Sequence, residues 1–162
     1  MVLRLGERYS RGMMYFEEVR VGEATEVGRH TPSREEIISF AKAWDPQPFH
    51  IDEAAANASL LGGLSASSCH TYSISSLIYS RSDHKLYTTA MMGLEMRFPN
   101  PVRPGEELTL TRAFLDARLS RSRPGQGVVK SRSTLLNAQG AEAMVQTSNY
   151  LVACRPVRGL LG

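Results

Sequence analysis

Cysteine and long apolar runs are both scarce in this sequence. The 162 residues include two cysteines, Cys69 and Cys154, and neither belongs to a closely spaced pair. No stretch approaches the roughly 18 apolar residues that a membrane span needs, and no apolar run follows a basic start. These absences predict a reduced, cytoplasmic protein that is neither secreted nor inserted in a membrane.

Strong charge of one sign is also missing. The net charge is +3, and a mildly basic chain can meet nucleic acid, a membrane surface or a phosphorylated ligand. The basic residues concentrate at Arg112, Arg118, Arg121, Arg123, Lys130 and Arg132. Because no aromatic side chains alternate with them, as they do in proteins that bind single strands, we interpret this stretch as a solvated hairpin. Contact with a phosphate is the alternative, and no nucleic-acid or membrane partner is expected.

The residues that are present have the composition of a globular protein. The hydrophobic fraction is 42% and the charged fraction is 22%, which excludes a disordered or fibrous chain. At this length residues 1–162 fit a single domain. Residues 1–14 are weakly patterned and are expected to form a loose N-terminal arm, whereas residues 15–19 should anchor aromatic side chains on the domain.

The segment from Asp45 to His50 carries the most distinctive chemistry. Pro46 and Pro48 remove two backbone donors and fix two φ angles, so we expect a stiff loop rather than regular helix. A carboxylate and an imidazole at its two ends are the pair that general acid–base catalysis on one water requires. The alternatives are a turn aspartate beside an ordinary histidine, or a metal site that also uses Asp52. Asp52 is better explained as the N-cap of the alanine-rich helix that follows.

Two longer helices are predicted on either side of this segment. Ser33 and Glu36 match a capping box, in which the Ser33 hydroxyl accepts from the Glu36 amide and the Glu36 carboxylate reaches back. The first helix should therefore begin at residue 34 and end before Pro46, with Trp44 as a core anchor on its apolar face. The second should run from about residue 67 to 82.

The remaining pattern predicts five strands. They are expected near residues 24–30, 88–98, 107–115, 128–136 and 143–153. One strand, then helices, then four strands is typical of an α+β fold in which an antiparallel sheet wraps around one long central helix.

Four segments resemble the MaoC-like dehydratases, a family that includes the (R)-specific enoyl-CoA hydratases. They are residues 40–52, 62–67, 98–105 and 15–22. The resemblance implies a hotdog fold with Asp45 and His50 as the catalytic dyad, holding a water that adds across the C2–C3 double bond of an enoyl thioester. It also implies that backbone amides near Ser67 and Ser68 bind the thioester carbonyl, where they would stabilise developing negative charge. A coenzyme A thioester is then the substrate, with no metal and no redox cofactor.

The chain departs from this family at the start of its long helix. Where many members read Ser-Gly-Trp-His or His-Gly-Met, the present sequence reads Ser67-Ser68-Cys69-His70. Ser68 therefore replaces a glycine, and its Cβ could crowd the thioester. Cys69 and His70 are not expected to act as a nucleophile–base pair, because adjacent helical residues do not face one another.

Three further residues are predicted to bind substrate. They are Gly63, Arg97 and Arg103, the two arginines as candidate partners for the phosphates of coenzyme A. Arg103 has an equally good structural interpretation, bonding local carbonyls. A homodimer or higher homo-oligomer is expected because such a sheet leaves an edge strand. The alternative functions are a hotdog acyl-CoA thioesterase and a non-catalytic acyl-CoA-binding module.

Overall fold

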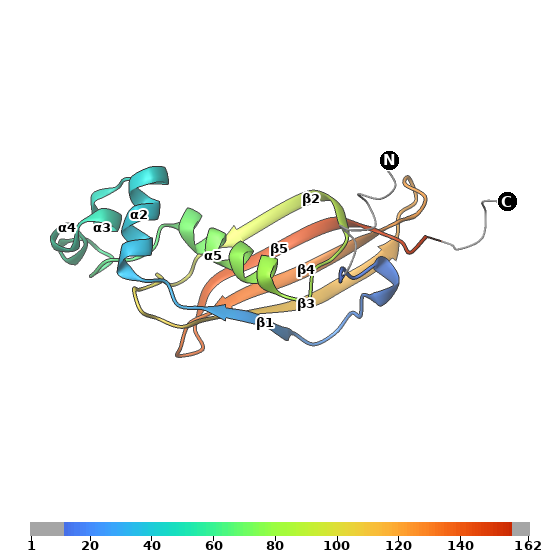
Figure 1. The fold of residues 1–162 in the computed structure, drawn as a ribbon, viewed down its shortest axis with the longest axis horizontal. Coiled ribbons are helices and arrows are strands. Elements are labelled where there is room, and N and C mark those ends of the chain that lie inside the picture. The colour runs from blue at the N-terminus through green and yellow to red at the C-terminus, as the bar shows by residue number, and fades with distance from the viewer. Residues whose placement is uncertain (1–11, 157–162) are drawn as a thin grey trace.

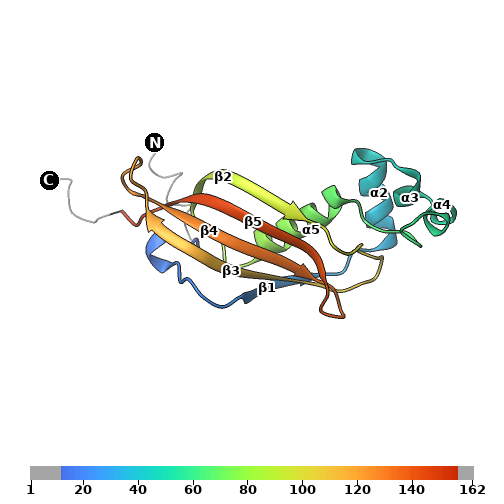
Figure 2. The ribbon, with the colours of Figure 1, turned by 180° about the vertical axis from the view of Figure 1, so that it is seen from behind.

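A five-stranded antiparallel sheet packs against one long helix in the computed structural model, which describes residues 12–156 (Figures 1 and 2). The strands lie in the order β1–β3–β4–β5–β2. They span Thr25–His30 (β1), Thr88–Arg97 (β2), Leu108–Leu119 (β3), Gln126–Leu136 (β4) and Glu142–Ala153 (β5), and the long helix α5 spans Ser68–Arg81. The α+β arrangement expected from the sequence, a sheet wrapped around one helix, is confirmed.

Three other helices gather at one end of the sheet, beside the N-terminus of α5 (Figure 1). They are α2 (Arg34–Trp44), α3 (Pro48–Ile51) and α4 (Glu53–Ala58), and a single 3-10 turn, η1 (Phe16–Glu18), precedes β1. Polar side chains cap α2 and α4 as predicted, and a third caps α5: Ser33, Asp52 and Ser67 each accept an N–H of the first turn. No helix among residues 12–156 combines the length and the apolar character needed to cross a bilayer.

The main core lies between α5 and the sheet. Ile74 and Ile78 are four residues apart on α5, so they share a face, and both are buried among strand residues. On β3 the buried positions alternate, as a strand with one covered face requires. A second cluster at the far end of the sheet holds Val129 and Val152 with the ring of Phe16 from η1 packed against them. The anchoring role expected for residues 15–19 is thus present.

The segment from Asp45 to His50 is more helical than expected. Pro48 occupies the first position of α3, whose four residues include His50. Proline is tolerated there because its missing N–H and fixed φ suit a first helical turn. The prediction of a loop without helix was therefore wrong from Pro48 to His50.

Two predictions for α2 were also wrong. Trp44 is 75% exposed and is not a core anchor, because the C-terminal end of α2 extends beyond the sheet while Ile37 and Ala41 make the core contacts (Figure 2). The Glu36 amide donates to the Ser33 hydroxyl as predicted. The Glu36 carboxylate, however, bonds two histidines instead of reaching back to its own helix start.

Two surface predictions need correction as well. Most of the arm expected at residues 1–14 lies outside the described residues, but Met14 is not loose, since it pairs with the backbone of Lys85 and Tyr87. Arg112 is not part of a solvated hairpin, because it is 7% exposed. The other basic residues of that stretch are exposed as expected, namely Arg118, Arg121, Arg123, Lys130 and Arg132.

Candidate active site

His50 lies at the base of a cavity at the N-terminal end of α5. It is buried, and its Nδ1 lies 2.7 Å from the carbonyl oxygen of Ser65. A carbonyl can only accept, so this bond assigns the ring proton to Nδ1 and leaves Nε2 as a lone-pair acceptor. Nε2 has no hydrogen-bond partner among residues 12–156, and the ring lines the cavity. The imidazole is therefore set up as a base toward the cavity.

Asp45 lies where α2 ends, five residues before His50. Its backbone N–H closes the helix on Ala41, and its half-buried carboxylate accepts from the side-chain amide of Gln47 at 3.0 Å. Within the described part of the chain no hydrogen bond or ion pair joins Asp45 to His50. Asp45 and His50 are thus close in sequence, but a different residue orients each side chain: Gln47 for Asp45 and Ser65 for His50.

The cavity beside His50 has a volume of about 310 Å³. Its lining includes Ser68 and Thr71 of α5, Phe49 of α3, and the turn from Phe98 to Pro101. The amide of His70 is bonded to the Ser67 hydroxyl and that of Thr71 to the Ser67 carbonyl. The first two amides of α5, those of Ser68 and Cys69, have no partner among residues 12–156, as expected at a helix N-terminus. They carry partial positive charge beside the cavity and could accept an oxyanion.

Arg103 holds the turn that delivers Ser65. Its guanidinium donates to the carbonyls of Leu61, Gly63 and Leu64, with distances of 2.5 Å to Gly63 and 3.2 Å to Leu64. Gly63 has φ +149°, and a Cβ there would lie 3.3 Å from Arg103 Nη1. The turn therefore favours glycine, and Arg103 has the carbonyl-bonding role that was considered equal to ligand binding. Its contact with phosphate stays a prediction.

The other predicted site residues occupy separate places. Ser67 is fully buried as the cap of α5, whereas Ser68 is exposed and lines the cavity. The serine that replaces a family glycine is thus at the cavity wall. Arg97 is exposed at the end of β2, next to Phe98 of the cavity wall.

A second polar cluster joins α2 to α5. The Glu36 carboxylate lies 3.0 Å from His30 Nε2 and 3.2 Å from His70 Nε2, and the His70 ring stacks on Phe40. Burial lowers the pKa of the His70 imidazole, against the raising effect of its hydrogen bond with Glu36. Cys69 points to solvent while His70 is buried, so the two do not form a nucleophile–base pair. Within residues 12–156 no group of three or more metal-ligating side chains is placed to hold a metal ion.

Comparison with known proteins identifies the family. The family described as "MaoC like domain" matches residues 18–135. The chain belongs to the MaoC-like family. The MaoC-like dehydratase from Rhodospirillum rubrum is 37% identical, with a TM-score of 0.82 over 89% of this chain and 99% of that one. The uncharacterized protein YdeM of Bacillus subtilis is 29% identical over 69% of this chain and 81% of its own length.

A more distant likeness supports the fold alone. The R-hydratase PhaJ1 from Pseudomonas aeruginosa, in its unliganded form, has a TM-score of 0.68 at 18% identity and covers 93% of this chain and 95% of that one. The predicted hotdog fold of the MaoC-like chain is thereby confirmed. The roles of individual residues in this protein stay predictions.

Sequence reasoning missed three residues that the structure brings into the argument. The carbonyl of Ser65 fixes the His50 tautomer, a role that the sequence did not suggest. Gln47 lies between the two prolines, and its side-chain amide orients Asp45. Arg112 was grouped with surface charge, although it follows Leu108 and Leu110 in strict alternation, the one sequence signal that it faces inward.

Proposed function

We propose that this MaoC-like protein is an acyl-thioester hydratase/dehydratase. It would add water reversibly to a trans-2-enoyl-CoA-type thioester and give the 3-hydroxyacyl thioester. The observation that supports the proposal is the buried His50, whose Nδ1 is bonded to the Ser65 carbonyl and whose ring lines a cavity at a helix N-terminus. A base and unpaired amide donors thus border the same space.

The chemistry follows from these positions. Asp45 and His50 hold the water, and the dyad accepts one of its protons as the oxygen bonds to C3. The C2–C3 double bond becomes an enolate, whose negative oxygen accepts hydrogen bonds from the free amides of Ser68 and Cys69. Return of the proton to C2 completes the addition. Electrons and protons balance without a redox partner, so we propose that no metal or organic cofactor takes part.

A paired assay tests the reaction. Loss of the enoyl-thioester absorbance in the ultraviolet reports hydration, and release of free thiol reports hydrolysis. We expect the first without the second, and activity that survives dialysis against a chelator. Thiol release would favour a thioesterase, and binding of the thioester with neither signal would favour a non-catalytic acyl-CoA-binding module.

Coenzyme A is proposed as the thioester handle. Arg97 is exposed beside the cavity wall, and the exposed arginines from Arg118 to Arg132 supply further cations for its phosphates. Phosphate contacts far from the reacting carbons provide uniform binding, so neutralising such an arginine should raise KM with kcat nearly unchanged. The effect should be absent with a truncated pantetheine thioester. Equal losses on both substrates would count against phosphate recognition by that arginine.

A homodimer is proposed as the working assembly. Strand β2 is at the edge of the sheet, and it exposes Met91, Met92 and Leu94. An edge strand with apolar side chains is a surface that proteins pair or cover. Sedimentation of the purified chain should therefore show a dimer, and a chain that is monomeric and active at nanomolar concentration would contradict this.

A further inference from the structure

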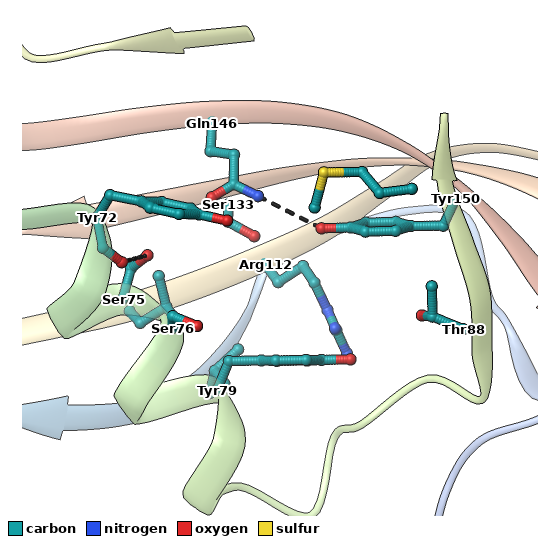
Figure 3. A pocket seen from close by; sticks show the side chains of 12 residues that line it. Tyr72, Ser75, Ser76, Tyr79, Thr88, Arg112, Ser133, Gln146 and Tyr150 are labelled. Carbon is teal, nitrogen blue, oxygen red and sulfur yellow. Dashed lines mark hydrogen bonds between the residues drawn. The ribbon is translucent and has the colours of Figure 1, made fainter. Parts of the chain in front are cut away.

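A second cavity, separate from the one at His50, lies between α5 and the sheet (Figure 3). It has a volume of about 260 Å³ and is lined from α5 by Tyr72, Ser75 and Tyr79. Thr71 lines the first cavity, and Ser75 lies four residues further along the same face of α5. At 1.5 Å of rise per residue, Ser75 lies roughly 6 Å beyond Thr71 along the helix.

The sheet side of this cavity is polar across three strands. Arg112 of β3 pairs with Ser133 of β4, and Ser133 pairs with Gln146 of β5, so the three form one row across the sheet. All three line the cavity. A sheet face that packs on a helix is ordinarily apolar, and buried polar groups carry a cost unless they are bonded. This row therefore needs an explanation beyond packing.

Arg112 is a buried cation without a counter-ion. It is 7% exposed, and no carboxylate among residues 12–156 forms an ion pair with it. Its Nη2 donates to the carbonyl of His84, and its guanidinium lies 5.0 Å from the ring centre of Tyr79 and 4.8 Å from that of Phe114. Aromatic rings attract a cation only weakly. The other N–H groups of the Arg112 guanidinium have no hydrogen-bond partner among residues 12–156. A buried charge of this kind is stabilised by an anion.

Two tyrosine hydroxyl groups near Arg112 are further hydrogen-bond donors to the cavity. Tyr79 accepts from the Leu86 amide at 2.8 Å, and Tyr150 accepts from the Gln146 side-chain amide at 3.3 Å. The Tyr79 hydroxyl proton is therefore left to donate, and the Tyr150 hydroxyl, which also interacts with the Ser148 side chain, can turn its proton to the cavity. Figure 3 shows both rings beside Arg112. A cation with two hydroxyl donors suits an acceptor with several lone pairs and a negative charge, which is the character of a carboxylate.

We propose that this cavity binds a carboxylate at the far end of the acyl chain, with Arg112 as its counter-charge. The inference rests on the proposed function, because it assigns the acyl group of the same thioester. The substrate class is then a dicarboxylic acyl thioester, with one carboxyl group in the thioester and the other free. An acyl chain running along α5 from the thioester would place its free end among Arg112, Tyr79 and Tyr150.

Calorimetric titration of the full chain tests this without turnover. The probes are three matched pairs of saturated thioesters: succinyl-CoA with butyryl-CoA, adipoyl-CoA with hexanoyl-CoA, and suberoyl-CoA with octanoyl-CoA. Within each pair the ligands differ only in a terminal carboxylate or methyl group. In at least one pair the carboxylate should bind about tenfold tighter or more, the usual worth of a charged hydrogen bond. Equal affinity, or tighter binding of the methyl ligand, in all three pairs overturns the proposal.

Two variants test whether Arg112 is responsible for the preference for the carboxylate ligands. Arg112→Gln should abolish it, whereas Arg118→Gln, at an exposed arginine of the same strand, should leave it intact. A preference that persists in folded Arg112→Gln overturns the role of Arg112. If Arg112→Gln fails to fold, Tyr150→Phe removes only a hydroxyl and should weaken the preference severalfold, and an unchanged preference there counts against the site.

The outcome separates the inference from the proposed function. Hydration of enoyl thioesters without a carboxylate preference defeats the inference alone. A carboxylate preference in a protein that hydrates no thioester supports the site and defeats the proposed reaction.

Discussion

The two cavities beside α5 differ in how their polar groups are held. At the N-terminal end, His50 is fixed by the backbone carbonyl of Ser65, fifteen residues away, in a turn that is itself bonded through carbonyls. On the sheet side, Arg112, Ser133 and Gln146 come from three strands and meet through strand register. Main-chain contacts thus position the polar group of the first cavity, whereas strand register brings together the polar side chains of the second.

This difference is consistent with separate roles for the two cavities. Main-chain contacts tolerate little change, since altering them shifts the groups that must meet the reacting atoms. Side chains in a row across a sheet can be exchanged singly while the ladder of backbone bonds is kept. We infer that the first cavity supports the reaction and that the second selects the acyl group. Four experiments test this division, and the largest effect is expected at the dyad.

Replacing the dyad should abolish most activity. Asp45→Asn and His50→Ala are each expected to lower kcat by roughly a hundredfold to ten-thousandfold, the usual contribution of general acid–base catalysis. Because the two residues would act on one water, the double variant should lose little more than the worse single variant. Steady-state hydration kinetics measure this, with circular dichroism as the control for folding. Additive losses would show that the two act separately.

The position of Asp45 at the end of α2 could be predicted because its determinants are local. Pro46 and Pro48 end one helix and start another, and Ser67 caps α5 from the adjacent position. Such signals lie within a few residues of the group they position. The five strands followed from alternation for the same reason, with differences of a few residues at their ends.

Other features depended on partners far along the chain. Glu36 was expected to cap its own helix, but its carboxylate bonds His70, which is 34 positions later. Trp44 had the spacing of a core residue, yet no element among residues 12–156 covers that end of α2. The polar row of the second cavity needs the register of β3, β4 and β5, which no local pattern reveals. Of the residues in this row, only Arg112 had a sequence signal for its inward position, because it alternates with Leu108 and Leu110.

Arg103 offers the next largest effect and distinguishes positioning from phosphate binding. Arg103→Met removes the donors to Leu61, Gly63 and Leu64, so the turn that carries Ser65 should shift. Misplacing His50 in this way is expected to lower kcat by roughly tenfold to a hundredfold. The loss should be the same with coenzyme A and pantetheine thioesters.

Arg97→Ala is the matched control for this experiment, because Arg97 is exposed and has no ion-pair partner among residues 12–156. It should raise KM for the coenzyme A thioester and leave kcat unchanged. A raised KM with normal kcat in Arg103→Met, confined to the coenzyme A substrate, would instead make Arg103 a phosphate ligand.

Gly127 tests the far end of the sheet, which borders neither catalytic group. A Cβ at this position would lie 2.0 Å from Cδ2 of Phe16, so Gly127→Ala must displace the ring that packs on Val129 and Val152. Overpacking of this kind costs about 1–3 kcal/mol. Urea unfolding should show this loss while kcat at low temperature stays normal.

Gly93→Ala is its control. A Cβ at Gly93 would lie 3.7 Å from Asn149 Nδ2, an ordinary contact. If Gly127→Ala is as stable as Gly93→Ala, η1 does not pack on the sheet as described.

His70 is expected to give the smallest effect, a dependence of stability on pH. Its Nε2 bonds Glu36, and its Nδ1 is buried with no hydrogen-bond partner among residues 12–156. A second ring proton is therefore disfavoured, and burial lowers the pKa of His70 from the ordinary 6.5. The unfolded chain therefore binds this proton at a higher pH than the folded chain does. Stability should be complete above about pH 6.5 and fall as the pH drops below it, by at most about 1.4 kcal/mol per pH unit.

Urea unfolding of the wild type and His70→Gln, from about pH 7.5 to 5, measures this contribution. Glutamine can donate to Glu36 but does not titrate there, so the variant's stability should depend less on pH. His70 connects α2 to α5, so lowering the pH should weaken the packing of α2, which ends at Asp45. The sheet-side cavity should stay intact at that pH. Carboxylate preference should then persist at a pH where kcat has already fallen. Identical pH profiles in the two proteins would show that His70 does not carry the dependence.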